Sequence, residues 1–301
     1  MKIRIGFGLG TRTGAVDASP FVELVDALDD LGFDSLWLSE RLTEASPDPV
    51  VGLAIAAGRS QRLKLGTSVQ VLPGRNPVLV AKEWATLDRL SGGRALPAFG
   101  LGIADSREQA AFGVERGERA AWFDEALPLV RRLWTGEPVD HDGPRFRLSG
   151  VRVRPTPLNE RLDVWLGGRA RAELRRVGRL GDGWLPSFCT PDDVVAGRAV
   201  VEATAAEHGR AIDADHYGAL IPYVPTAGPH PDLLVAALAA RRPDLADRPG
   251  DVPAGLDALR ECIGRFVEAG ASKFVVVPVV EPEGWTAHLT DVADALLDLH
   301  A

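Results

Sequence analysis

The sequence predicts an α/β protein, a (β/α)8 barrel with insertions that forms a single domain. Short apolar runs alternate along the chain with longer segments of helical period, a pattern typical of βα units around a parallel sheet. Eight such units can be placed in the 301 residues, and a (β/α)8 barrel takes roughly 250 residues and grows by insertions. A doubly wound sheet explains the alternation equally well, but it usually has fewer strands.

The composition favours a cytoplasmic protein with a large core. Hydrophobic residues make up 46% of the chain and charged residues 25%, which suits a folded domain of this length. The net charge of -8, spread without blocks of like charge, argues against a nucleic-acid partner. No apolar run reaches the roughly 18 residues of a membrane span. Residues 1–6 predict a strand rather than a signal peptide, so we expect the cytoplasm and no membrane partner.

The predicted strands are short and rich in apolar residues. They are residues 3–9, 35–39, 64–71, 95–101, 163–166, 183–186, 217–224 and 273–279. Trp37 lies in the second of them, and we expect it to pack against a helix rather than to contact a ligand.

Two of the intervening helices have clear N-terminal signals. The first is predicted to begin at Ser19 as N-cap, with Pro20 at the first helical position. Its apolar face consists of Phe21, Leu24, Val25 and Leu28. The second begins at Thr190, which is followed by a proline and two aspartates beside the positive end of the helix dipole.

Two insertions account for the length beyond a minimal barrel. Residues 139–153 predict a hairpin before strand five, with Asp142 and Gly143 in a tight turn. Residues 225–253 are rich in Pro, Asp and Arg and follow strand seven. We expect them to form a partly helical lid at the C-terminal mouth of the barrel.

In a barrel the functional residues gather where strands end and βα loops begin. Gly167, Gly168 and Arg169 follow strand five and precede a helix that begins near Arg171. This order allows a phosphate to approach backbone N–H groups at the positive end of the helix. The alternative is a tight βα turn with a solvated arginine.

Other common sites lack their sequence patterns. The chain has no GxGxxG, no GxxxxGK[ST] and no GxSxG motif, which argues against Rossmann, P-loop and serine-elbow sites. Its six histidines form no close ligand pairs with one another or with a cysteine, so we expect no metal. The two cysteines, Cys189 and Cys262, lie far apart, and we expect both to be reduced and buried.

Glu40 is a candidate for acid–base chemistry. It follows the apolar strand 35–38, and in the right register it faces the barrel mouth as an acid, a base or a hydrogen-bond acceptor. The alternative is an ion pair with Arg41 or Arg12.

Several segments together resemble the luciferase-like monooxygenase superfamily, which includes oxidoreductases dependent on the deazaflavin coenzyme F420. Their order and spacing carry the resemblance over most of the chain. The segments are LGFDSLWLSE (31–40), LGTSV (65–69), TLDRLSGGR (86–94), LWTGEPV (133–139), VWLGGR (164–169) and RLGDGWLP (179–186). The resemblance implies a (β/α)8 barrel with insertions, the same fold that the alternation predicts.

The resemblance also implies a (deaza)flavin in the barrel mouth. Gly167, Gly168 and Arg169 are then expected to hold its phosphate, and Gly100 and Gly102 to leave space for its ring system. A non-prolyl cis peptide behind the central ring is implied at Ser68–Val69. Ser39 and Glu40 are expected to contact the ring edge or the hydroxylated side chain. The implied cofactor-binding residues are Ser39, Thr67, Ser68, Val69, Gly100, Gly102, Gly167, Gly168 and Arg169.

The chain departs from its apparent relatives at two positions. Many relatives have a histidine where this chain has Arg41, and arginine does not give up a proton near neutral pH. Sugar-phosphate dehydrogenases of the family have a glutamate just after the GxG of strand four, where this chain has Ile103 and Ala104. The two departures argue against a general acid at Arg41 and against a sugar-phosphate substrate. We assign catalytic roles to Glu40, as a polar residue near the reacting centre, and to Arg41, as an anchor for an anionic substrate or oxyanion.

The resulting hypothesis is an oxidoreductase that transfers a hydride between coenzyme F420 and a small organic substrate. One alternative is a monooxygenase that takes reduced FMN from a separate reductase, and another is a flavin-binding member without turnover. A phosphate-handling aldolase or isomerase is disfavoured because no lysine follows strand six. The resemblance implies a homodimer through the helices that flank strands two to four, where residues 78–80, Trp84 and Leu87 are apolar.

Overall fold

The computed structural model describes residues 2–11, 17–159, 161–245 and 247–300. Its strands close into a parallel barrel. One sheet has the order β11-β12-β1-β2-β3-β5 and a second the order β10-β9-β6-β4. The two join because β3 continues into β4 and β5 into β6, and because isolated parallel bridges link Trp184 to Tyr217 and Ser187 to Leu220. This closed ring confirms the (β/α)8 barrel over an open doubly wound sheet.

The barrel strands lie where the sequence predicts them. Their bounds are β1 Arg4–Leu9, β2 Ser35–Leu38, β3 Lys64–Thr67, β4 Gln70–Val71, β5 Ala95–Leu96, β6 Ala98–Gly100, β9 Trp165–Leu166, β10 Gly183–Trp184, β11 Gly218–Tyr223 and β12 Lys273–Pro278. The predicted strands 64–71 and 95–101 are each interrupted. The first break is at Ser68–Val69, which is a cis peptide bond as the resemblance implies. The second is at Pro97, which has no N–H for the ladder.

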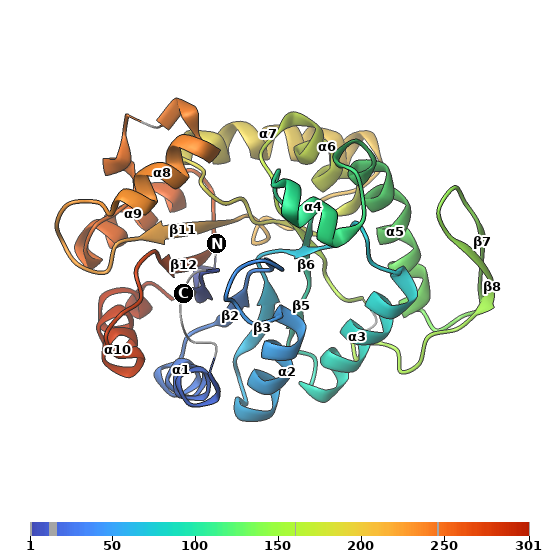
Figure 1. The fold of residues 1–301 in the computed structure, drawn as a ribbon, viewed down its shortest axis with the longest axis horizontal. Coiled ribbons are helices and arrows are strands. Elements are labelled where there is room, and N and C mark those ends of the chain that lie inside the picture. Colours follow the sequence, from blue (N-terminus) through green and yellow to red (C-terminus); the bar gives the residue numbers. More distant parts are fainter. Residues whose placement is uncertain (1, 12–16, 160, 246, 301) are drawn as a thin grey trace.

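Helices surround the strands on the outside (Figure 1). Their bounds are α1 Ala18–Leu31, α2 Pro49–Arg59, α3 Pro77–Leu90, α4 Ser106–Phe112, α5 Arg119–Trp134, α6 Arg171–Leu180, α7 Pro191–Glu207, α8 Asp232–Arg241, α9 Leu256–Glu268 and α10 Trp285–Leu296. Helix α7 has the predicted cap, since Thr190 and Asp193 exchange side-chain and backbone hydrogen bonds. The predicted cap at Ser19 is wrong, because α1 begins at Ala18 with Asp17 as N-cap, while its apolar face is buried as expected.

The hairpin insertion is confirmed and projects from the edge of the molecule (Figure 1). It consists of β7 Val139–Asp142 and β8 Arg147–Val151. The predicted turn is displaced, because Asp142 pairs with Arg147 and the loop is residues 143–146. The second insertion contains α8 and two short 3-10 helices, Pro243–Leu245 and Pro249–Asp251. No described helix is long and apolar enough to cross a membrane.

The barrel interior is filled by large and small residues at facing positions. Trp37, Trp165, Ala98, Leu185 and Val275 form a buried cluster there. The strands leave room for the two indole rings: a Cβ on Gly66 would lie 2.4 Å from Trp37 Cε3, and one on Gly183 would lie 2.5 Å from Trp165 Cδ2. Trp37 therefore packs inside the barrel and not against a helix as predicted.

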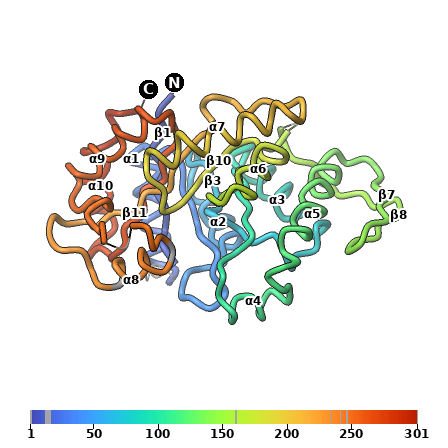
Figure 2. Tube along the Cα trace, turned by 90° about the horizontal axis from the view of Figure 1, so that it is seen from above, coloured from blue at the N-terminus to red at the C-terminus, as the bar shows by residue number. Residues whose placement is uncertain are grey.

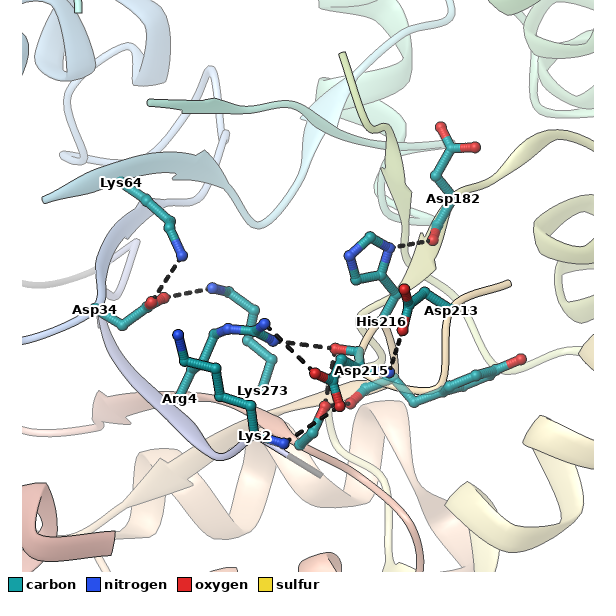
Figure 3. A network of polar contacts seen from close by, with 11 residues as sticks. Lys2, Arg4, Asp34, Lys64, Asp182, Asp213, Asp215, His216 and Lys273 are labelled. Carbon is teal, nitrogen blue, oxygen red and sulfur yellow. Dashed lines mark hydrogen bonds and ion pairs between the residues drawn. The ribbon is translucent and has the colours of Figure 1, made fainter. Parts of the chain in front are cut away.

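The N-terminal end of the barrel is closed by an ion network (Figure 3). Asp34 lies between Lys273, with Nζ 2.5 Å from Oδ2, and Lys64, with Nζ 2.9 Å from Oδ1. Burial raises the pKa of Asp34, but the two ammonium groups lower it further, so that the pKa lies well below its usual range. The chain termini also lie at this end, where Ile5 N–H donates to His300 Nε2.

Candidate functional site

A cavity of about 580 Å³ lies at the opposite end, where the parallel strands end. Its volume falls within the roughly 300–1,000 Å³ typical of small-molecule sites. Residues that follow β1, β2, β6, β9, β10 and β12 line it, and α8 contributes the residues of the second insertion. Figure 2 shows α4 and α8 on one side of the barrel, away from the termini.

Most of the predicted site residues meet at this cavity. Those that line it are Ser39, Glu40, Arg41, Ser68, Val69, Gly100, Gly102, Gly167 and Gly168. Thr67 and Arg169 are not among the lining residues. Thr67 is fully buried, and its hydroxyl donates to Ala98 O at 2.7 Å and accepts from Ala98 N at 2.9 Å. This pair connects β3 to β6 beside the break at Pro97.

Glu40 is held by partners that the sequence does not indicate. Its Oε2 accepts from Val71 N–H at 2.7 Å, and its Oε1 is paired with the Arg75 guanidinium. Burial raises the pKa of Glu40, and Arg75 and the Val71 N–H only partly offset that rise. The alternative of an ion pair with Arg41 is wrong, because Glu40 pairs with Arg75 instead, and Arg12 lies outside the described residues. Glu40 lines the cavity with both carboxylate oxygens already engaged.

Arg41 also has its charge balanced within the chain. Its Nε lies 3.3 Å from Glu108 Oε1 and its Nη2 lies 3.4 Å from Glu44 Oε1. Glu108 comes from α4 and also accepts from Leu42 N–H and from the backbone and hydroxyl of Thr43. Burial raises the pKa of Glu108, but these hydrogen bonds lower it further. The carboxylate therefore fixes the loop after β2 in place.

The back wall of the cavity is built around Val69. A Cβ on Gly100 would lie 2.4 Å from Val69 Cγ2, and one on Gly167 would lie 3.2 Å from Val69 Cγ1. Glycine at both positions lets three neighbouring strands expose backbone around this side chain. The hydroxyls of Ser39 and Ser68 lie 3.1 Å apart on the same side. This side of the cavity is polar and suits a hydroxylated, planar ligand.

The N-terminus of α6 lies at the edge of this polar side. The helix begins at Arg171 as predicted, and Gly168 has φ +98°, a conformation that favours glycine. Glu173 Oε2 accepts from Arg169 N–H and Ala170 N–H, both at 2.9 Å. A carboxylate of this chain therefore occupies the anion position where we expected a phosphate. The spacing of an acid three residues into the helix could have predicted this contact.

The opposite side of the cavity is apolar and roofed by α8. Leu234 and Ala237 of α8 line it, together with Phe188 after β10. Arg242, buried at the end of α8, donates to Phe188 O at 2.5 Å and to Asp193 Oδ2 at 2.7 Å. These hydrogen bonds attach the lid to the barrel. The attachment point, Phe188, has a φ of +51°.

Neither cysteine nor a metal cluster adds chemistry to the described part of the chain. Cys262 is buried as expected, whereas Cys189 is only half-buried. Burial raises the pKa of the Cys189 thiol to about 12, so it is not a nucleophile at neutral pH. In the described residues, no three His, Cys, Asp or Glu side chains lie together as metal ligands.

The luciferase-like monooxygenase family has a sequence profile that matches residues 2–229 of this chain. The chain belongs to this family, and the resemblance found in the sequence is confirmed.

Two relatives and two solved structures show the range of the family. The chain is 29% identical over 238 residues to a phthiodiolone/phenolphthiodiolone dimycocerosates ketoreductase of Mycobacterium tuberculosis, covering 67% of this chain and 62% of the relative. It is 29% identical over 191 residues to the F420-dependent glucose-6-phosphate dehydrogenase of Nakamurella multipartita, covering 60% and 56%. The matches thus span about three fifths of the length of these curated relatives.

The solved structures show the same fold across the whole chain. An F420-dependent secondary alcohol dehydrogenase in complex with an F420-acetone adduct superposes with a TM-score of 0.84 at 20% identity, covering 100% of both chains. A monooxygenase from Streptomyces bottropensis has a TM-score of 0.80 at 21% identity, covering 98% of this chain and 99% of that one.

Proposed function

We propose that this protein is an oxidoreductase that transfers a hydride between coenzyme F420 and a small organic substrate. The observation that carries the proposal is the cavity at the barrel mouth, whose wall combines Val69, Gly100 and Gly167. The name of the F420-dependent relative supports the cofactor. When bound, the deazaflavin accepts or donates the hydride, and the chain supplies binding, orientation and exclusion of water.

The residues of the polar side fit such a cofactor. The backbone around Val69 offers a flat wall because two glycines flank it. The hydroxyls of Ser39 and Ser68 are positioned to bind a hydroxylated side chain. We assign the cofactor phosphate to the N-terminus of α6, where it takes the N–H groups of Arg169 and Ala170 from Glu173. The Arg169 guanidinium is not needed for this contact.

Glu40 and Arg41 are proposed to shape the site electrostatically. Glu40 holds Val71 and Arg75 at the end of β4, beside the cavity. Arg41 lies between two carboxylates, so an oxyanion that develops on the substrate during the reaction competes with Glu108 and Glu44 for its charge.

A parallel titration of the purified protein with F420 and FMN, followed by cofactor fluorescence, tests the proposal. Tighter binding of F420 is the expected result. Tighter binding of FMN favours the monooxygenase alternative with a separate reductase, since flavin activates oxygen in a way that the deazaflavin does not. Binding of neither cofactor contradicts the proposal.

We further infer a homodimer through α2 and α3. Of the apolar residues expected at this face, Val80, Trp84 and Leu87 are buried in the core, but Leu79 is exposed, as are Val51 and Ile55 of α2. We expect Leu79→Asp to shift the protein to monomer in sedimentation velocity, because it buries a charge in an apolar interface. Leu90→Asp, at the exposed end of the same helix, is the control, and a monomeric wild type contradicts the inference.

A further inference from the structure

The cavity has two chemically different sides, and the apolar one is not explained by a polar cofactor. Its wall comes from β11, β12 with the residues after it, and the lid. The lining residues of this side are Phe188, Leu220, Pro222, Pro231, Leu234, Ala237, Val277, Pro278, Val279 and Val280. Among the described residues that line the cavity from β11, from β12 with the residues after it, and from the lid, Glu281 alone is charged, and its side chain is exposed.

We propose that this side is the substrate compartment and that it takes an uncharged molecule with an apolar body. The proposal rests on the proposed function, because the polar side is then occupied by the cofactor. An anionic substrate would lose its hydration there without gaining a cationic partner, which is costly. An apolar body instead gains from burial in proportion to the surface removed from water.

Helix α8 forms the roof of this compartment through one face. Pro231, Leu234 and Ala237 recur every three residues and line the cavity, as one face of a helix requires. Ala236 and Ala239 lie on the other face and are exposed. Leu234 and Leu238 also pack with Val224 and Val252 in a small separate core. Helix α8 is therefore packed into the fold through its own small hydrophobic core.

The roof is also fastened at both ends. Arg242 binds Phe188 O and Asp193 after α8, and His230 Nε2 lies 2.8 Å from Val252 O before it. Because Phe188 both lines the compartment and accepts from Arg242, the roof and the wall are joined. The compartment thus has a defined shape, which limits the size of the apolar body that it accepts.

The test uses Nile red, an uncharged apolar fluorophore, titrated into the full-length protein, with F420 titrated separately into the same samples. Ala237→Phe places a ring in the compartment, and Ala239→Phe adds the same ring on the exposed face of α8. We expect Ala237→Phe to weaken Nile red binding by about tenfold, a typical effect of filling an apolar pocket, and Ala239→Phe to leave it unchanged. F420 affinity is expected to be the same in both variants and the wild type.

The outcomes separate the two proposals. Nile red binding that is absent, or equal in wild type and Ala237→Phe, overturns the apolar compartment even if F420 binds. Loss of Nile red binding in Ala237→Phe without F420 binding to any of the samples supports the compartment and contradicts the cofactor. If Ala237→Phe does not fold, the smaller Ala237→Leu is expected to weaken Nile red binding in the same direction.

Discussion

Glu173 is the residue whose charge most directly opposes the proposed cofactor phosphate. Its carboxylate accepts from the Arg169 and Ala170 N–H groups, which are the donors that an anion at the start of α6 needs. We predict that Glu173→Gln tightens F420 binding by about tenfold, because a negative charge next to the phosphate is removed.

Fluorescence titration of F420 measures this change. Glu207→Gln, which removes an exposed carboxylate at the C-terminal end of the next helix, α7, is the matched control and should leave the affinity unchanged. Equal or weaker F420 binding in Glu173→Gln would place the phosphate elsewhere.

For individual residues, the sequence predicted well which side chains reach the cavity, but it predicted poorly which partners they contact. Glu40, Arg41 and Ser39 follow an apolar strand, and strand ends meet at one mouth, so their location was predictable. Their partners were not, because Arg75 and Glu108 come from loops and helices whose positions depend on tertiary packing. A carboxylate that ends a strand predicts a site but not its ion pair.

Among the elements, α8 is joined to the barrel by the buried side chain of Arg242. Its guanidinium donates to Phe188 O and to Asp193. Replacing Arg242 leaves two half-buried acceptors without a donor and removes packing at the end of α8, at a cost of about 1–3 kcal/mol. We predict that Arg242→Ala opens the lid and speeds cleavage within residues 226–253 in limited proteolysis.

Arg248→Ala is the control for this prediction. Arg248 pairs with Asp251 at 2.8 Å on the surface of the same segment, and such pairs contribute little. Equal cleavage rates in Arg242→Ala and the wild type would show that the lid is not held by Arg242.

The order of the elements was predictable because each βα unit has its own local signals. The caps of α7 and the strand runs are encoded within a few residues, and they agree with the structure. The breaks at Ser68–Val69 and Pro97 divide strands that hydrophobicity alone makes continuous. The turn of the hairpin was displaced because Asp142 pairs with Arg147, a cross-strand contact that local turn preferences do not reveal.

For the whole molecule, the barrel is closed at the end away from the cavity by Asp34, Lys64 and Lys273. Lys273 is almost fully buried, so it depends on the Asp34 carboxylate for its charge. We predict that Asp34→Asn lowers the free energy of unfolding by about 3–5 kcal/mol, because a buried charge loses its partner. Urea unfolding at neutral pH measures the loss, and the double variant Asp34→Leu with Lys273→Met should recover part of it.

The same network sets a direction for the dependence of stability on pH. The pKa of Asp34 is lowered in the folded state from 3.8, so its contribution is present above pH 3.8 and is lost as the pH falls towards the folded pKa. The stability of Asp34→Asn should therefore fall less steeply in acid than that of the wild type. An identical acid dependence would contradict this role for Asp34.

We propose that coenzyme F420 binds against the wall formed by Val69, Gly100 and Gly167. The most direct test is a fluorescence titration of F420 into the wild type, Gly167→Leu and Gly264→Leu. Gly167 lines the cavity, whereas Gly264 lies on α9 with open space around it. We expect Gly167→Leu to abolish F420 binding and Gly264→Leu to bind F420 like the wild type. Wild-type affinity in a folded Gly167→Leu protein would contradict it.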